Sequence, residues 1–192
     1  MPIHWTYDAN WEPVGDLEQG DVLLPTPDLV GLFTKVHPYF CDQKYVGFIV
    51  LTQSCDLVRR RNQRCAARYI NLGVIRQLDT VLSGLFDTVC HSVAEGVYLE
   101  ESKLEAKKLL ARVFNQNEHG LGLFYLHSDA DIGLGKPCVA LLRVSVAFRA
   151  EHYDVIRGAR RGRLLAEFRN KLGWLAENPA YAAVQTQTIV LE

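Results

Sequence analysis

The chain has 192 residues, of which 48% are hydrophobic and 22% are charged, and its formal net charge at pH 7 is −1. This composition excludes a generally disordered chain and predicts one compact domain over residues 1–192 with a self-sufficient core. No stretch approaches the roughly 20 apolar residues that span a bilayer. Residues 1–21 have neither the basic start nor the apolar core of a secretory signal. We therefore expect a cytoplasmic protein that has no contact with a membrane.

The cysteines indicate reduced thiols. There are five, an odd number at irregular spacings, which argues against a disulfide framework. No CxxC or HxxxH spacing occurs, and zinc ligands usually come in close pairs. The remaining alternative is a zinc site built from Cys55, Cys65 and a distant histidine. We expect no metal and no cofactor.

Residues 1–19 form an acidic arm, which its prolines, glycines and aromatic residues predict to be extended. No lysine or arginine precedes Lys35. The acidic residues before it are Asp8, Glu12, Asp16, Glu18, Asp21 and Asp28. Such an arm either lies across a basic face of the same protein or offers a separate surface to a second partner.

Residues 20–148 are predicted to form a sheet with inserted helices. Gly20–Leu24 is interpreted as a turn that leads into a strand. The apolar segment Leu29–Val36 is a second candidate for a strand. Gly47–Leu51 is too short for an ordinary helix and rich in β-branched and aromatic residues, so we expect a strand buried on both faces. Tyr69–Ile75 is expected to return antiparallel to it.

A possible reactive turn follows the buried strand at Ser54, Cys55 and Asp56. A thiolate is a nucleophile, and a carboxylate can act as a base or orient a partner. His37 is a possible base for Cys55, and His127 and His152 are alternatives. The structural interpretation makes Cys55 a small buried side chain and Asp56 a cap for the following segment.

A basic run comes next in the chain. It consists of Arg59, Arg60, Arg61, Arg64 and Arg68. A long arginine-rich connection between two strands is a possible phosphate-binding loop, because one guanidinium group can donate two parallel hydrogen bonds to two phosphate oxygens. The alternative is a solvated loop whose arginines pair with the acidic segment of the same protein.

Helices and strands alternate in the second half of the chain. Apolar spacings of three and four predict helices over Arg76–Val89 and Ser102–Phe114, the second with a capping box at its start. A hairpin or loop is expected around Gly96. Leu121–His127 and Cys138–Phe148 are predicted strands, and the second of these is expected to be central.

A basic amphipathic helix is predicted near the C-terminus, over Arg160–Glu177 within residues 149–178, and a tail follows at 179–192. Its polar side carries Arg160 and Arg161, among other basic residues. A helix of this kind either lies along nucleic-acid phosphates or presents a solvated face.

Two resemblances accompany these patterns. The opening Gly20–Val22 followed by FIVLTQS resembles the PemK/MazF group of bacterial small-barrel ribonuclease toxins. The segments GFIVLTQSCDL, FNQNEHGLGLFYLH and HYDVIRGARRGRLLAEFRNKLGWL are similar to a group of uncharacterised bacterial proteins. That group shares a Ser-Cys-Asp turn and an arginine-rich C-terminal helix, and it implies a place among mobile-element or defence genes.

Together these observations predict an α+β fold, a small, mostly antiparallel β-barrel or curled sheet with two or three packed helices. The favoured function is nucleic-acid or nucleotide-phosphate binding in a bacterial toxin or defence locus, with ribonuclease-like activity as one form of it. Phosphate would be contacted by Arg59, Arg60, Arg61, Arg64, Arg160 and Arg161. The alternatives are a cysteine-dependent hydrolase or transferase that uses Cys55, Asp56 and His37, and a non-catalytic protein-interaction subunit. The expected partners are RNA, DNA or a protein from the same locus, and a homo-oligomer is compatible with the sequence.

Overall fold

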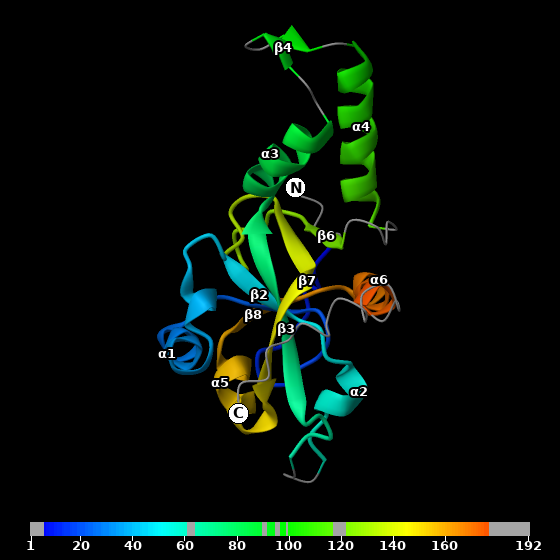
Figure 1. The fold of residues 1–192 in the computed structure, drawn as a ribbon. Coiled ribbons are helices and arrows are strands. Elements are labelled where there is room, and N and C mark those ends of the chain that lie inside the picture. The colour runs from blue at the N-terminus through cyan, green and yellow to red at the C-terminus, as the bar shows by residue number, and fades with distance from the viewer. Residues whose placement is uncertain are drawn as a thin grey trace.

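The computed structural model describes residues 6–60, 64–89, 92–94, 97–98, 100–116 and 122–176, with the backbone alone at 87–89, 92–94 and 97–98. The fold is α+β, a curled sheet of antiparallel strands with helices packed on it, which confirms the expected class (Figure 1). No helix in the described ranges is long and apolar enough to cross a bilayer.

The main sheet has six strands in the order β6-β7-β3-β2-β1-β8, and each neighbouring pair is antiparallel. The strands are β1 Asp21–Leu23, β2 Gly47–Val50, β3 Tyr69–Gln77, β6 Leu123–Leu126, β7 Cys138–Arg149 and β8 Arg160–Arg163. The expected pairing of the buried strand with the strand after the basic run is confirmed by the register Phe48↔Val74. The expected long central strand is β7, which lies between β6 and β3.

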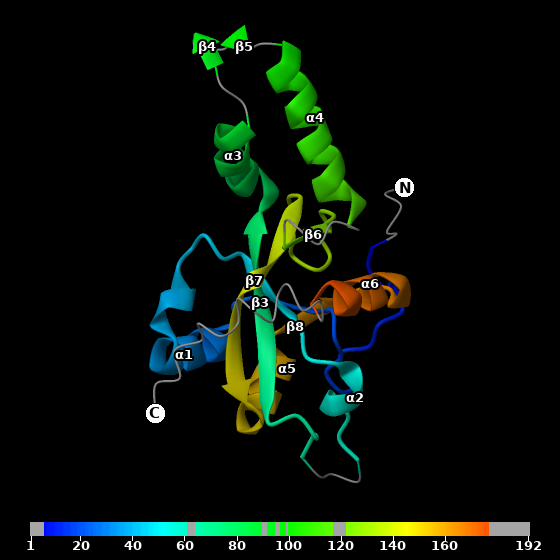
Figure 2. The ribbon, with the colours of Figure 1, turned by 45° about the vertical axis from the view of Figure 1, so that its right-hand side comes forward.

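Six α-helices are present in the described part of the chain. They are α1 Pro27–Val36, α2 Ser54–Leu57, α3 Leu78–Val89, α4 Glu100–Asn115, α5 Tyr153–Gly158 and α6 Ala166–Ala176. Two 3₁₀-helices, η1 Pro38–Cys41 and η2 Ala150–His152, and a small hairpin of β4 Ser92–Ala94 and β5 Val97–Tyr98 complete the fold. The helices α3 and α4 and the hairpin extend beyond one end of the sheet, away from the other helices, as Figure 2 shows.

Alternating side chains of the strands contribute to one large apolar core on each face of the sheet, and a smaller third cluster joins α3 and α4 to β6 and β7. Phe48 and Val50 pack with Phe33 of α1 and Ile156 of α5, whereas Ile49 packs with the apolar face of α6. This is the alternation that a strand buried on both faces requires. Accordingly, α1 and α5 lie on one side of the sheet and α6 on the other (Figure 1).

Two predicted elements differ from the structure in type or in their first residue. The apolar segment at Leu29–Val36 is helical, because Thr26 accepts a hydrogen bond from the N–H of Leu29 and Pro27 occupies the first turn. The helix α4 begins at Glu100, so Ser102 lies within its first turn rather than at its N-cap. Of the hairpin or loop expected around Gly96, the structure has the hairpin, formed by β4 and β5, while Gly96 itself and the tail at 179–192 lie outside the described residues.

The largest difference is at the C-terminal helix. The helix exists, but it begins at Ala166, and Arg160–Arg163 form the edge strand β8 paired with β1. Long-range pairing with Asp21–Leu23 therefore overrides the local helical pattern. The segment at 149–178 contains two α-helices with a strand between them.

Candidate functional site

The acidic arm wraps around the side chain of Arg160. This residue is only 3% exposed. Its Nη1 donates to a carboxylate oxygen of Asp21 at 3.0 Å and to the carbonyl of Asp16 at 2.7 Å. Its Nη2 donates to the carbonyls of Pro13 at 2.7 Å and Gly15 at 2.9 Å. Arg160 therefore serves the fold and presents no surface to phosphate.

Arg163 and Arg169 are half-buried and pair with acidic residues of the same region. Arg163 Nε donates to Asp21 at 2.6 Å, and both Arg163 and Arg169 form ion pairs with Glu18. Burial raises the pKa of Asp21, and the guanidinium groups of Arg163 and Arg160 act against that rise. We call Arg160, Arg163 and Arg169 the arm-bound arginines. Of the two roles expected for the acidic arm, the structure shows the one in which it lies across a basic face of its own protein.

Arg59 is also held by acidic residues. Its backbone N–H donates to Asp16 at 3.0 Å, and its Nη1 donates to Asp154 at 3.0 Å. The guanidinium lies over the ring of Tyr153, 4.3 Å from the ring centroid. Burial is the main cause that raises the pKa of Tyr153, so its hydroxyl stays protonated at neutral pH. Arg59 thus shapes the site but is already paired.

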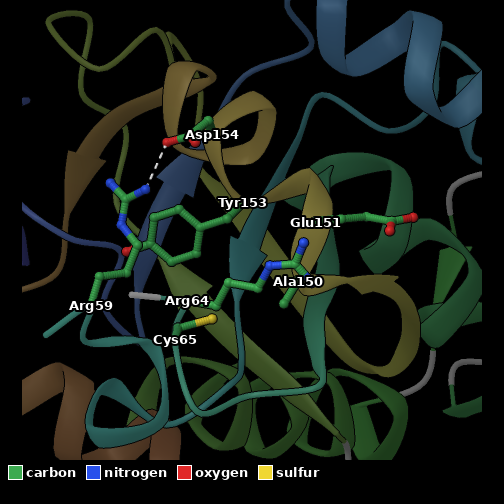
Figure 3. Close-up of a pocket in the computed structure, with 7 residues that line it drawn as sticks. All are labelled: Arg59, Arg64, Cys65, Ala150, Glu151, Tyr153 and Asp154. Carbon is green, nitrogen blue, oxygen red and sulfur yellow. Dashed lines mark hydrogen bonds and ion pairs between the residues drawn. The ribbon is translucent and has the colours of Figure 1, made fainter. Parts of the chain in front are cut away.

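A hollow of about 210 Å³ lies beside Arg59 and Tyr153, at the end of the sheet where β3 begins and β7 ends. It is lined by Arg59, Arg64, Cys65, Ala150, Glu151, Tyr153 and Asp154. Figure 3 shows the Tyr153 ring between the side chains of Arg59 and Arg64, and the Glu151 side chain pointing away. The lining is mixed in charge, and Arg64 is its exposed cation.

Exposed arginines surround this end of the sheet. Arg64 lines the hollow beside Ala150, and the carbonyl of Arg68 accepts from the N–H of Ala150 at 3.1 Å. Arg149 precedes Ala150, and Arg60 follows the anchored Arg59. We call Arg60, Arg64, Arg68 and Arg149 the rim arginines. All four are exposed, and none forms an ion pair within the described part of the chain.

The structure does not bring the expected catalytic residues together. Cys55 and Asp56 are both exposed, so the interpretation of Cys55 as a buried side chain is wrong. The thiol donates to Gln53 at 3.5 Å and to Asp56 at 3.8 Å. His37 ends α1 and packs edge-on against Phe148, and α1 and α2 lie on opposite sides of the molecule in Figures 1 and 2. No described histidine forms a hydrogen bond with Cys55.

The basic residues expected to contact phosphate divide into four groups. Arg60 and Arg64 are exposed, Arg59 is paired, Arg160 is buried, and Arg61 lies outside the described residues. Arg161 is exposed on β8, where its Nη1 donates to the carbonyls of Gly158 and Arg160. It lies on the edge strand furthest in the sheet order from β6.

Sequence reasoning missed Tyr153, which lines the hollow, and also Tyr69 and Arg149, which face the other side of the sheet at the same end. Arg149 ends the longest strand and pairs across the sheet with Tyr69, a register that the sequence does not reveal. No group of histidine, cysteine and carboxylate side chains among the described residues has an arrangement that would hold a metal ion. The described cysteines, Cys41, Cys55, Cys65 and Cys138, are free thiols.

Comparison with protein families, with curated proteins and with solved structures finds no match to this chain. Its function is therefore argued from its own residues.

Proposed function

We propose that this protein binds the phosphates of RNA or DNA through the rim arginines. The observation that carries the proposal is that four exposed arginines lie around one end of the sheet and that none of them forms an ion pair among the residues the structure describes. Guanidinium groups bind phosphate oxygens in a bidentate manner and release counterions when they do so. The arm-bound arginines and Arg59 have acidic partners within the chain, so they contribute little to such a surface.

The near-neutral total charge is compatible with this function. The formal net charge is −1, and the carboxylates of Asp16, Glu18 and Asp21 are held in ion pairs with Arg59 and the arm-bound arginines rather than at the rim. Charge that is neutralised inside the fold does not oppose a polyanion at the rim, because exposed charges further apart than about 8–10 Å are screened at physiological salt. A ribonuclease-like reaction and a role in a toxin or defence locus stay predictions from the sequence.

The test is fluorescence anisotropy of a labelled oligonucleotide over a salt series. We compare the wild type with Arg64→Ala/Arg68→Ala and with a matched control, Lys107→Ala/Lys108→Ala on α4. Both double variants remove two exposed positive charges, and α4 lies at the other end of the molecule (Figure 1). A variant that loses two phosphate contacts is expected to show a salt slope smaller by about 1.4 for single strands, since each contact contributes about 0.7.

The expected result is salt-sensitive binding that Arg64→Ala/Arg68→Ala weakens and Lys107→Ala/Lys108→Ala leaves nearly unchanged. Equal weakening in the two variants would show that only the total charge matters and would refute the rim site. Absence of wild-type binding at low salt would refute nucleic-acid binding itself.

A further inference from the structure

An aromatic side chain is exposed at the start of β3, on the side of the sheet opposite to the hollow and across from Arg149. Tyr69 is the first residue of β3, and 46% of it is exposed. Its ring makes no ring contact within the described part of the chain. Large aromatic side chains on a sheet are usually buried. The exposed ring of Tyr69 is therefore accessible to a ligand.

The pairing of β3 with β7 places a cation beside this ring. Tyr69 lies directly opposite Arg149, and Asn71 lies opposite Ala147. Directly opposite residues of an antiparallel pair share one face, with Cβ atoms about 4.5–5.5 Å apart. Tyr69, Asn71 and Arg149 are exposed, whereas Ile70 between the first two is buried in the core. The exposed face therefore presents the Tyr69 ring, the Arg149 guanidinium across from it on β7, and the Asn71 carboxamide two residues further along β3.

These groups match the chemistry of an unpaired nucleotide. A base stacks on an aromatic face whatever its sequence, a guanidinium binds the adjoining phosphate, and a carboxamide offers a donor and an acceptor to a base edge. A duplex cannot use the ring in this way because its bases are stacked inside the helix. The chemistry of the face therefore separates single strands from double strands.

We propose that the ligand of the rim is single-stranded nucleic acid, with one base stacked on the Tyr69 ring and the adjoining phosphate bound by Arg149. This inference rests on the proposed function and adds the class of substrate. The phosphates that follow along the strand then pass around the end of β3 to Arg68 and to Arg64, which lines the hollow on the other side of the sheet.

The test compares single-stranded and duplex oligonucleotides of equal length in anisotropy titrations with the wild type, Tyr69→Ala, Tyr69→Phe and Tyr39→Ala. Tyr39 is the matched control because it is also an exposed tyrosine, 70% exposed on η1. A second readout is the emission of 2-aminopurine placed within the single strand, which is quenched when that base stacks on a ring.

We expect the wild type to prefer the single strand, and Tyr69→Ala to weaken its binding about tenfold, within the range measured for base-aromatic stacking. Tyr69→Phe keeps the ring and should bind within about twofold of the wild type, as should Tyr39→Ala. Quenching of 2-aminopurine is expected in the wild type and Tyr69→Phe and lost in Tyr69→Ala.

Two results would overturn this inference and leave the proposed function standing. One is single-strand binding that Arg64→Ala/Arg68→Ala weakens but Tyr69→Ala does not. The other is duplex binding as tight as single-strand binding. Absence of all nucleic-acid binding by the wild type would overturn both proposals together.

Discussion

The arm-bound arginines and the rim arginines are the same residue type in opposite environments. Arg160 is almost fully buried and satisfies four strong acceptors, one of them the carboxylate of Asp21. Arg64 is exposed beside a hollow and has no ion pair among the described residues. Clusters of arginine in a sequence therefore have two distinct uses, and only the three-dimensional partners tell them apart.

The physical reason for the difference is desolvation. A guanidinium that leaves water loses several kcal/mol of hydration, and only charged or carbonyl partners around it offset that loss. The acidic arm supplies those partners to Arg160, as the carbonyls of Pro13 and Gly15 show. An exposed guanidinium keeps its water and needs no partner, so it remains available to a ligand.

Removal of Arg160 should have the largest effect on stability. Arg160→Ala leaves the buried Asp21 carboxylate and three arm carbonyls with fewer donors, and breaking a buried pair in this way costs about 3–5 kcal/mol. Arg160→Lys keeps the charge but loses the planar fork, so an intermediate loss is expected. The measurement is the free energy of unfolding from urea titrations followed by circular dichroism.

Arg161→Ala is the control for that experiment, because Arg161 is the exposed neighbour on the same strand. Its expected change is within about 0.5 kcal/mol. If Arg160→Ala unfolded at the same urea concentration as Arg161→Ala, the contrast between the two arginine environments would be wrong.

A smaller effect is expected when Asp154 loses its charge. Its carboxylate is 69% exposed and accepts from Arg59 Nη1 at 3.0 Å and from Arg157 Nη2 at 3.2 Å. Asp154→Asn removes the carboxylate that pairs with Arg157 and one of the two that hold Arg59, which Asp16 still contacts, and it removes a negative charge from the lining of the hollow. We expect oligonucleotide affinity to rise about threefold at low salt, less than the 1.4 kcal/mol that corresponds to a factor of ten.

The control for Asp154 is Asp79→Asn, an equal change of charge on α3 near the other end of β3. Asp79 is also largely exposed, and Lys136 lies 4.0 Å from it. An equal rise in affinity for both variants would assign the effect to total charge rather than to the released guanidinium groups.

The smallest effect is a pH dependence from Asp16. Burial acts to raise the pKa of this carboxyl, but hydrogen bonds from Arg59 and Tyr153 outweigh it and hold the pKa below its ordinary value. A lowered pKa means that the stabilisation is complete above the unfolded-state pKa of about 3.9 and is lost as the pH falls through the folded-state value. Asp16→Asn should therefore cost less than about 1 kcal/mol at neutral pH.

Urea midpoints of the wild type and Asp16→Asn between pH 7 and pH 3 check this sign. The difference between the two proteins should be constant near neutral pH and shrink in acid. A difference that grew as the pH fell would mean that the pKa of Asp16 is raised in the folded protein.

Much of the fold follows from local patterns in the sequence. The run at Gly47–Leu51 predicts β2 because a short, β-branched segment suits a strand covered on both faces. Apolar spacing predicts α3 and α4 to within a few residues. The strand β8 was missed because its arginines fit the polar face of the helix that follows, and its pairing with β1 is a long-range contact.

The site was less accessible to prediction. The basic run identified Arg60 and Arg64, which are exposed as a phosphate surface requires. The basic run also included Arg59, and the predicted C-terminal helix contributed Arg160, both by charge alone, since nothing local shows that Asp16 and Asp21 hold them. Tyr69 and Arg149 meet only through the register of β3 with β7, so no inspection of either segment by itself joins them.

The measurement that most directly tests the contrast between the arm-bound arginines and the rim arginines is chemical footprinting of arginine side chains. Phenylglyoxal modifies accessible guanidinium groups, and mass spectrometry of the digested protein reports the rate at each arginine, with and without a saturating single-stranded oligonucleotide. We predict fast modification of Arg64, Arg68 and Arg149, protection of these three by the oligonucleotide, and no modification of Arg160 or Arg163 in the folded protein. Rapid modification of Arg160, or rim arginines that react equally fast with the oligonucleotide present, would contradict the account.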